Sequence, residues 1–157
     1  YITGNFTLRS GQKSNEYFDK YRFESHPATL KAIAEQMAKL IPKNIDYLAG
    51  LEMGGIPVAT ALSLVTGIPS LFVRKEAKTY GTCQFAEGVA SIEGLRLCLI
   101  EDVVTTGGQV VQSCKDLRGS GAVISDALCV IHRGGGMEPL KNAGLALHPL
   151  FEMSELK

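Results

Sequence analysis

The stretch from Cys98 to Gln109 constrains the fold of this chain more than any other. An apolar run, Leu97–Ile100, precedes two carboxylates, Glu101 and Asp102, which are followed by a turn of small residues and a helical pattern. The run predicts a buried strand of a parallel sheet. The pattern predicts a helix whose apolar face carries Val110, Val111, Cys114 and Leu117. The loop between them would lie at the carboxyl end of the strand, where open α/β sheets bind ligands.

The residues of this loop indicate a sugar phosphate as the ligand. Small residues allow successive backbone N–H groups and a helix N-terminus to point at an anion such as phosphate. Glu101 and Asp102 do not favour that phosphate electrostatically, so we expect them to contact hydroxyls or a metal-bound group of the same ligand. No Gly-x-x-x-x-Gly-Lys-Ser/Thr occurs and no Gly-x-Gly-x-x-Gly follows a strand, so a nucleotide hydrolase and a dinucleotide site lack support. An ordinary strand-to-helix turn is the alternative.

The composition favours one domain without a global charge. The 157 residues suffice for a single core, and 16 basic residues balance 16 acidic ones, which argues against non-specific binding to nucleic acid or a membrane. No apolar run is long enough to span a membrane. The four cysteines are far apart and predict reduced, mostly buried thiols of a cytoplasmic protein: Cys83, Cys98, Cys114 and Cys129. The chain begins with Tyr1, and we expect an N-terminal segment to be missing from it.

The first residues predict a hairpin. Two short strands, Phe6–Arg9 and Glu16–Asp19, flank a polar turn. Tyr17 and Phe18 are adjacent, so they point to opposite faces of the second strand and at most one of them joins the core. The other is free to cover a ligand, with simple packing inside the hairpin as the alternative.

The rest of the chain alternates helices and strands. A helix is expected from Pro27 to before Pro42, with one apolar stripe of Leu30, Ile33, Ala34, Met37, Leu40 and Ile41. Predicted strands are Tyr47–Leu51, Ser70–Val73, Ala122–Ile131 and Leu145–Phe151, and a helix at about 56–66 follows the first of them. Pro149 indicates an edge strand or a strand end. This order predicts a mostly parallel α/β sheet with helices on both faces.

Three further loops carry candidate ligand groups. Glu52–Gly55 contains two glycines, which permit positive φ and close backbone approach and suit a second anion such as a diphosphate, or form a plain turn. A loop of about twenty residues begins at Arg74 with three cations in five residues, which suits a lid that closes on a polyanion, or a solvated charged loop. Arg133 precedes three glycines and suits recognition of a carboxylate or ring carbonyl, or it lies unengaged on the surface.

Together these motifs resemble the orotate phosphoribosyltransferases, which are type I phosphoribosyltransferases. Leu99–Gly108 resembles the signature of that class for phosphoribosyl diphosphate (PRPP), and Arg74–Lys78 resembles the catalytic loop. The hairpin is similar to the hood that closes over a flat pyrimidine, and Gly50–Pro57 and Arg133 also match. The resemblance implies the type I phosphoribosyltransferase fold, a mostly parallel twisted sheet flanked by helices with a small N-terminal β hood. It implies one domain over 1–157, with the hood region at 1–24 and the core sheet and helices at 42–151.

The resemblance also implies a reaction and its residues. PRPP would give its phosphoribosyl group to orotate, forming orotidine 5′-monophosphate and diphosphate in de novo pyrimidine biosynthesis. Lys78, Asp102 and Glu101 would be catalytic, with the acidic pair on the ribose hydroxyls. PRPP would be bound by Arg74, Lys75, Lys78, Tyr80, Glu101, Asp102, Val103, Val104, Thr105, Thr106, Gly107, Gly108 and Gln109. Orotate would be bound by Tyr17, Phe18, Thr105 and Arg133.

The resemblance further implies that Mg²⁺ is held mainly by PRPP. It also implies a cytoplasmic homodimer with shared active sites, and neither nucleic acid nor a membrane as a partner. Tyr80 departs from the pattern, since many members have histidine there, and so does Gln109, where Ser or Thr is common. The helix that usually precedes the hood is absent, and nothing represents a fused decarboxylase. Two rival functions are a phosphoribosyltransferase for purine bases and a PRPP-sensing regulator that binds RNA or a protein.

Overall fold

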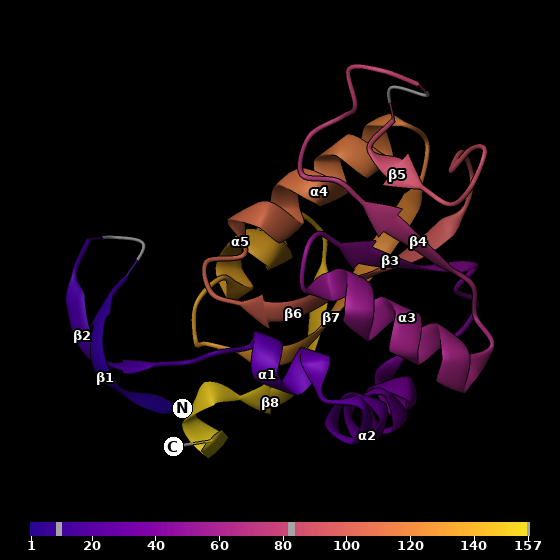
Figure 1. The fold of residues 1–157 in the computed structure, drawn as a ribbon. Coiled ribbons are helices and arrows are strands. Elements are labelled where there is room, and N and C mark those ends of the chain that lie inside the picture. Colours follow the sequence, from indigo (N-terminus) through magenta and orange to yellow (C-terminus); the bar gives the residue numbers. More distant parts are fainter. Residues whose placement is uncertain (9–10, 82–83, 157) are drawn as a thin grey trace.

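The computed structural model describes residues 1–8, 11–81 and 84–156 (Figure 1). Its strands are β1 (Ile2–Thr7), β2 (Lys13–Tyr17), β3 (Tyr47–Leu51), β4 (Ser70–Val73), β5 (Ala86–Glu87), β6 (Arg96–Val104), β7 (Val123–His132) and β8 (Ala146–Glu152). Its α-helices are α1 (Tyr21–Ser25), α2 (Pro27–Met37), α3 (Gly55–Thr66), α4 (Gly108–Gly119) and α5 (Met137–Asn142), and 3-10 turns cover Ala38–Leu40 and Met153–Leu156.

Six strands form one sheet in the order β5-β4-β3-β6-β7-β8, and β1 and β2 form a separate antiparallel pair. Neighbours in the large sheet are parallel, except for the antiparallel pair of β4 and β5. The predicted fold class is therefore confirmed. After β3 the chain adds β4 on one side, and β6 then pairs with the other side of β3. The carboxyl ends of β3 and β6 thus meet at a topological switch point, the usual ligand site of open α/β sheets.

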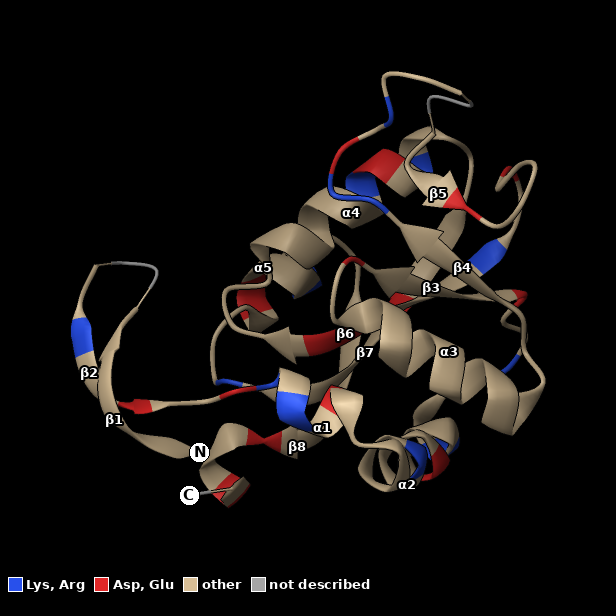
Figure 2. Ribbon diagram, in the orientation of Figure 1, with Lys and Arg blue, Asp and Glu red and all other residues tan. Residues whose placement is uncertain are grey.

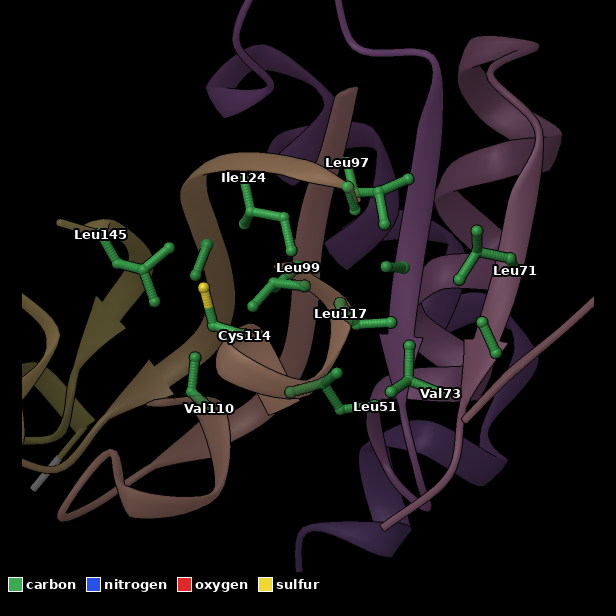
Figure 3. Packing of buried hydrophobic residues seen from close by; sticks show 14 of the residues in the cluster. Leu51, Leu71, Val73, Leu97, Leu99, Val110, Cys114, Leu117, Ile124 and Leu145 are labelled. Atoms are coloured by element: carbon green, nitrogen blue, oxygen red, sulfur yellow. The ribbon is translucent and has the colours of Figure 1, made fainter. Parts of the chain in front are cut away.

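Helices cover both faces of this sheet (Figure 1). Successive strand residues point to opposite faces, so Leu97 and Leu99 of β6 join the core under α4 and α5, while Cys98 and Ile100 join the core under α2 and α3. Figure 3 shows the first of these cores, in which Cys114 and Leu117 of α4 pack on the sheet. Strands buried on both faces explain why the apolar runs in the sequence are continuous.

Several predicted elements have different boundaries. Strand β6 continues to Val104 because its ladder with β7 continues past the apolar run, pairing Glu101 with Cys129 and Val104 with His132. The prediction that the two carboxylates follow the strand is therefore wrong: they lie within it. The helix from Pro27 ends at Met37 and continues as a 3-10 turn, and the short helix α1 was not predicted.

The N-terminal hairpin is also shifted from its prediction. Strand β1 pairs Ile2 with Tyr17, so the first strand begins earlier and the second ends at Tyr17. Arg9 and Ser10, which belong to the predicted strand and turn, lie outside the described residues. In Figure 1 the hairpin stands away from the main sheet.

The predicted twenty-residue loop is interrupted by β5, which pairs with β4 through Glu87 and Phe72. Strand β8 is the edge strand that Pro149 predicts. Cys98, Cys114 and Cys129 are free and buried, as expected, whereas Cys83 lies outside the described residues. No helix among the described residues has the length and hydropathy needed to cross a membrane.

Candidate active site

Glu101 and Asp102 are the central polar residues at the carboxyl end of β6. The Glu101 side chain is 9% exposed and that of Asp102 is 1% exposed, although both carry carboxyl groups. As neighbours on a strand they point to opposite faces. Glu101 lines a hollow formed by the following loop, and Asp102 faces α1. The two carboxyls therefore have different surroundings.

Asp102 lies among three ionisable side chains: its neighbour Glu101, Lys20 just before α1, and Glu24 within α1. Lys20 Nζ is 2.8 Å from Asp102 Oδ2, and the backbone N–H of Val103 donates to Asp102 Oδ1 at 2.6 Å. Glu24 is 7% exposed, and its Oε1 is buried without a hydrogen-bond donor among the described residues. Figure 2 marks the acidic residues of β6 and of α1.

The pKa values of this cluster move apart. Burial, and then the hydrogen bond and charge of Asp102, raise the pKa of both Glu24 and Glu101 to about 9. Burial opposes the charge of Asp102, but hydrogen bonds from Glu24, Glu101 and Lys20 outweigh it and lower the pKa of Asp102. Burial and the neighbouring Asp102 thus favour the protonated form of Glu24 and Glu101, while Lys20 favours the ionised form of Asp102.

The loop after β6 is shaped to receive a small anion. Residues 103–110 and Glu101 line a hollow of about 70 Å³, and Gly107 has φ 75° just before α4 begins at Gly108. The side chains of Val103 and Val104 pack into the cores, so these two residues offer the hollow their backbone. Gln109 does not point freely into it, because its Nε2 donates to Ser113 Oγ at 3.2 Å.

The glycine-rich loop after β7 packs directly on the loop after β6. A Cβ on Gly135 would lie 2.7 Å from the carbonyl oxygen of Thr105, which is closer than real Cβ atoms come. Arg133 donates its backbone N–H to Val104 O at 2.9 Å, so it lies beside the same loop with an exposed side chain. The buried His132 contacts both Gly135 O, at 2.5 Å, and Glu152 Oε2, at 2.8 Å, and so joins this loop to β8.

The turn between β3 and α3 closes the other side of the site. A Cβ on Gly54 would lie 1.8 Å from Asp102 Oδ2 and 2.9 Å from Glu24 Oε1, and one on Gly55 would lie 2.2 Å from Ile100 O. The two glycines thus allow close approach to Asp102 and to the β6 backbone, whereas the predicted approach to an anion stays a prediction. Gly54 has φ −68°, so the positive φ that the two glycines also permitted is not used there.

The cations of the predicted lid are paired with acidic residues. Glu87 Oε1 lies 2.5 Å from Lys78 Nζ and 3.2 Å from Arg74 Nε. The backbone N–H of Lys75 donates to Glu52 at 2.5 Å. Lys78 is only 16% exposed, and its Nζ lies 5.8 Å from the ring centroid of the exposed Tyr80. The side chains of Arg74 and Lys78 are therefore already engaged by Glu87, whereas Lys75 contacts Glu52 through its backbone.

Tyr17 and Phe18 separate as the hairpin pattern predicts. Phe18 packs partly into the core under α2 and α3, with its ring centroid 5.5 Å from that of Tyr1. Tyr17 is exposed and lies beside Phe6, with ring centroids 5.4 Å apart. The structure thus brings the acidic pair, the loop after β6 and Arg133 together, while Tyr17 lies on the separate hairpin.

Four residues of this neighbourhood were missed from sequence: Lys20, Glu24, Glu87 and His132. Lys20 and Glu24 meet Asp102 far along the chain, whereas Glu87 pairs with two cations of its own loop and His132 contacts the nearby Gly135 as well as Glu152. None of the four belongs to a motif. The short spacing of Lys20 and Glu24 on one helical turn was the only available signal, and it is common on solvated helices.

Comparisons with known proteins agree with this geometry. Residues 21–143 match the family model described as phosphoribosyl transferase domain. An orotate phosphoribosyltransferase of a Nocardioides species is 49% identical over 156 residues, covering 99% of this chain and 87% of that protein. The crystal structure of Mycobacterium tuberculosis orotate phosphoribosyltransferase with Fe(III) dicitrate has a TM-score of 0.87 at 28% identity, covering 99% and 90% of the two chains. That of the same enzyme with PRPP has a TM-score of 0.82 at 26% identity, covering 96% and 88%.

Proposed function

We propose, from the fact that this chain belongs to the orotate phosphoribosyltransferase family, that it transfers the phosphoribosyl group of PRPP to a ring nitrogen of orotate. The products are orotidine 5′-monophosphate and diphosphate, and the pathway is de novo pyrimidine biosynthesis. The observation that carries the proposal is an anion-sized hollow lined by Glu101 at the switch point, with the carboxylate of Asp102 next to it in the chain. A sugar phosphate needs both of these features.

We assign PRPP to the loop after β6 and to the lid. The backbone of residues 103–109, including Thr105, Thr106, Gly107 and Gly108, would bind the 5-phosphate, with the N-terminus of α4 adding its dipole. Glu101 and Asp102 would receive the ribose hydroxyls. Arg74, Lys75, Lys78 and Tyr80 would meet the diphosphate, which requires Arg74 and Lys78 to leave Glu87.

Orotate would bind between the hood and the loop after β7. The Arg133 guanidinium suits the orotate carboxylate or a ring carbonyl, because its planar fork can donate two hydrogen bonds at once. Thr105 lies on the adjacent loop, and Tyr17 and Phe18 would cover the flat ring. For Tyr17 this assignment requires the hairpin to close over the sheet.

The proposed reaction requires cations beside the diphosphate and an active site that is closed to water. Breaking the C1–O bond of PRPP leaves positive charge on the ribose ring and negative charge on the departing diphosphate. Lys78 would stabilise the diphosphate, and a closed lid would exclude water and strengthen that interaction. No nucleophilic side chain is needed in this scheme.

We propose that Mg²⁺ enters with PRPP. Mg²⁺ usually keeps several waters and is bound through substrate phosphates and few carboxylates. The part of the chain that the structure describes holds no group of three or more His, Cys, Asp or Glu arranged as a metal site. When bound, the ion would neutralise part of the diphosphate charge. We also propose a cytoplasmic location, which three free, buried thiols support. The proposed assembly is a homodimer.

The test is to mix the protein with PRPP, Mg²⁺ and orotate and to follow both orotate absorbance and diphosphate release. Matched loss of orotate and release of diphosphate is the expected result. Adenine, guanine and uracil serve as parallel substrates. A preference for a purine would favour the first rival, and tight PRPP binding without diphosphate release from any base would favour a regulator.

A further inference from the structure

Two side chains at the start of α1 reach a residue that no motif connects to them. Lys20 immediately precedes α1 and Glu24 lies within it, and both meet Asp102 of β6, about eighty residues later in the chain. The Lys20 ammonium forms the ion pair with Asp102 Oδ2, and Glu24 Oε1 lies on the Gly54 side of the same carboxylate. Apart from that ion pair, Glu24 Oε1 and Asp102 Oδ2 are both buried without a hydrogen-bond partner among the described residues, and a proton on Glu24 would let it donate to Asp102.

These contacts fix both the orientation and the charge of Asp102. One of its oxygens accepts from the Val103 backbone, and the other forms the ion pair with Lys20, so both contacts favour one orientation of the carboxylate. Among the residues described, Lys20 is the cation that forms an ion pair with Asp102. A carboxylate that is 1% exposed and loses its cation takes up a proton more readily. It would then offer a ribose hydroxyl a different hydrogen-bond pattern.

We propose that Lys20 and Glu24 are positioning residues for PRPP binding, which hold Asp102 as an ionised, correctly oriented acceptor for the ribose hydroxyls. The inference rests on the proposed function, because it assumes that Asp102 meets PRPP. The two residues act through Asp102 and do not themselves touch the substrate.

The test measures the dissociation constant of PRPP with Mg²⁺ by calorimetry, without orotate. Lys20→Met keeps the aliphatic stem and removes the charge, and it is expected to weaken PRPP binding at least tenfold. Lys20→Arg keeps a cation and should recover most of that loss. Lys31→Met is the matched control, because Lys31 forms an exposed ion pair with Glu35 on α2. It should bind PRPP like the unmodified protein.

A double-mutant cycle shows whether Lys20 acts through Asp102. In an Asp102→Asn background, Lys20→Met should change PRPP affinity less than twofold. An equal loss in both backgrounds, or no loss in either, would overturn the inference while leaving the proposed function standing. If Asp102→Asn binds PRPP too weakly to measure, the test is whether Lys20→Arg regains the PRPP affinity that Lys20→Met loses. Failure of Lys20→Arg to regain it would overturn the inference.

Two further outcomes are informative. If Lys20→Met does not fold, Glu24→Leu replaces it, with Glu24→Gln as the variant that keeps a donor to Asp102; equal affinity in these two would overturn the role of Glu24. If the unmodified protein binds no PRPP, the proposed function fails first and the inference fails with it. Normal PRPP binding without orotate turnover would contradict the proposed reaction alone.

Discussion

At the scale of single residues, the site depends on how little space surrounds Asp102. The carboxylate is enclosed by Lys20, Glu24 and the backbone of Gly54, and a Cβ on that glycine would overlap its Oδ2. A glycine is needed there for close approach, not for a special backbone angle, because its φ is −68°. The position therefore tests the geometry of the acidic pair directly.

We expect Gly54→Ala to displace Asp102 and to weaken PRPP binding. Overpacking of this kind typically costs about 1–3 kcal/mol of stability. The measurement is PRPP affinity together with urea unfolding. Gly119→Ala at the end of α4 is the matched control, since a Cβ there has no atom within 4 Å, and it should be tolerated. Unchanged PRPP affinity in Gly54→Ala would contradict the placement of Asp102.

The protonated carboxyl of Glu24 predicts a pH dependence of stability. Its pKa is about 9 in the folded chain, against an ordinary value near 4.5, so between these pH values the folded state retains a proton that the unfolded state has lost. The contribution of Glu24 is complete below about pH 4.5 and is lost as the pH rises towards 9. The decline is at most about 1.4 kcal/mol per pH unit.

Glu24→Gln should remove that decline, because an amide donates a hydrogen bond to Asp102 at every pH. Urea unfolding at pH 5.5, 7 and 8.5 should show the variant gaining stability relative to the unmodified protein as the pH rises. Glu101, Lys20 and Asp102 remain in both proteins, and the amide that Glu24→Gln introduces can still donate to Asp102, so the main difference between the two proteins is the proton of Glu24. Glu35→Gln, an exposed change on α2, is the control. A stability difference independent of pH would contradict the assignment.

Sequence reasoning at this scale finds residues that lie close together along the chain. Glu101, Asp102 and the loop after them form one contiguous motif, so their meeting was predictable. The pairing of Lys20 with Asp102 depends on the packing of α1 against β6, which only the folded chain specifies. Glu87 lies in the same predicted loop as Arg74 and Lys78, but the pairing of β5 with β4 that brings it beside them depends on the folded chain.

At the scale of elements, the positive charges of the lid are paired with a carboxylate of the neighbouring strand. Strand β5 brings Glu87 beside β4, and this carboxylate occupies Arg74 and Lys78. Both hydrogen bonds and both charges lower the pKa of Glu87, which keeps it ionised at neutral pH. The carboxylate therefore competes with any diphosphate for the same cations.

Glu87→Gln should tighten PRPP binding severalfold, because it removes the competing charge from Arg74 and Lys78. The check is the PRPP dissociation constant at low and high salt, where the gain should be smaller at high salt. Glu76→Gln makes the same change of charge within the loop and should have a smaller effect. Weaker binding in Glu87→Gln would show instead that Glu87 supports the productive lid.

Lys78→Ala should lower turnover by roughly a hundredfold or more, since loss of one group that stabilises developing charge typically costs about 3 kcal/mol. The measurement is kcat at saturating PRPP and orotate. Lys43→Ala, which removes an exposed lysine before β3, should leave kcat unchanged. A near-normal rate in Lys78→Ala would exclude Lys78 as the group that stabilises the diphosphate.

Element boundaries show where sequence patterns stop being informative. Strand β3 and strand β4 were predicted to the residue, because both are short apolar runs bounded by turn residues. Strand β6 was predicted too short, because pairing with β7 carries polar residues into the ladder. Strand β5 has two residues and no pattern of its own, so its pairing with β4 could not be predicted.

At the scale of the whole molecule, the layer order follows from the alternation of strands and helices, and the switch point follows from the order of the strands. The single chain exposes three apolar side chains at and just before α3: Met53, Leu64 and Val65. Exposed apolar side chains of this kind are candidates for a subunit contact. The proposed homodimer would share its active sites, with lid cations of one subunit reaching the site of the other.

Subunit complementation tests that arrangement. Lys78→Ala and Asp102→Asn should each be nearly inactive alone, and in a shared-site dimer their changes fall in the same site of a mixed dimer, which leaves the second site intact. Random exchange of equal amounts should therefore restore roughly a quarter of the activity of the unmodified protein. Mixing either variant with itself is the control. If the mixture stays inactive after subunit exchange has been verified, each chain uses its own Lys78, and the contact between Lys78 and Glu87 within one chain is then the position from which that lysine reaches the diphosphate.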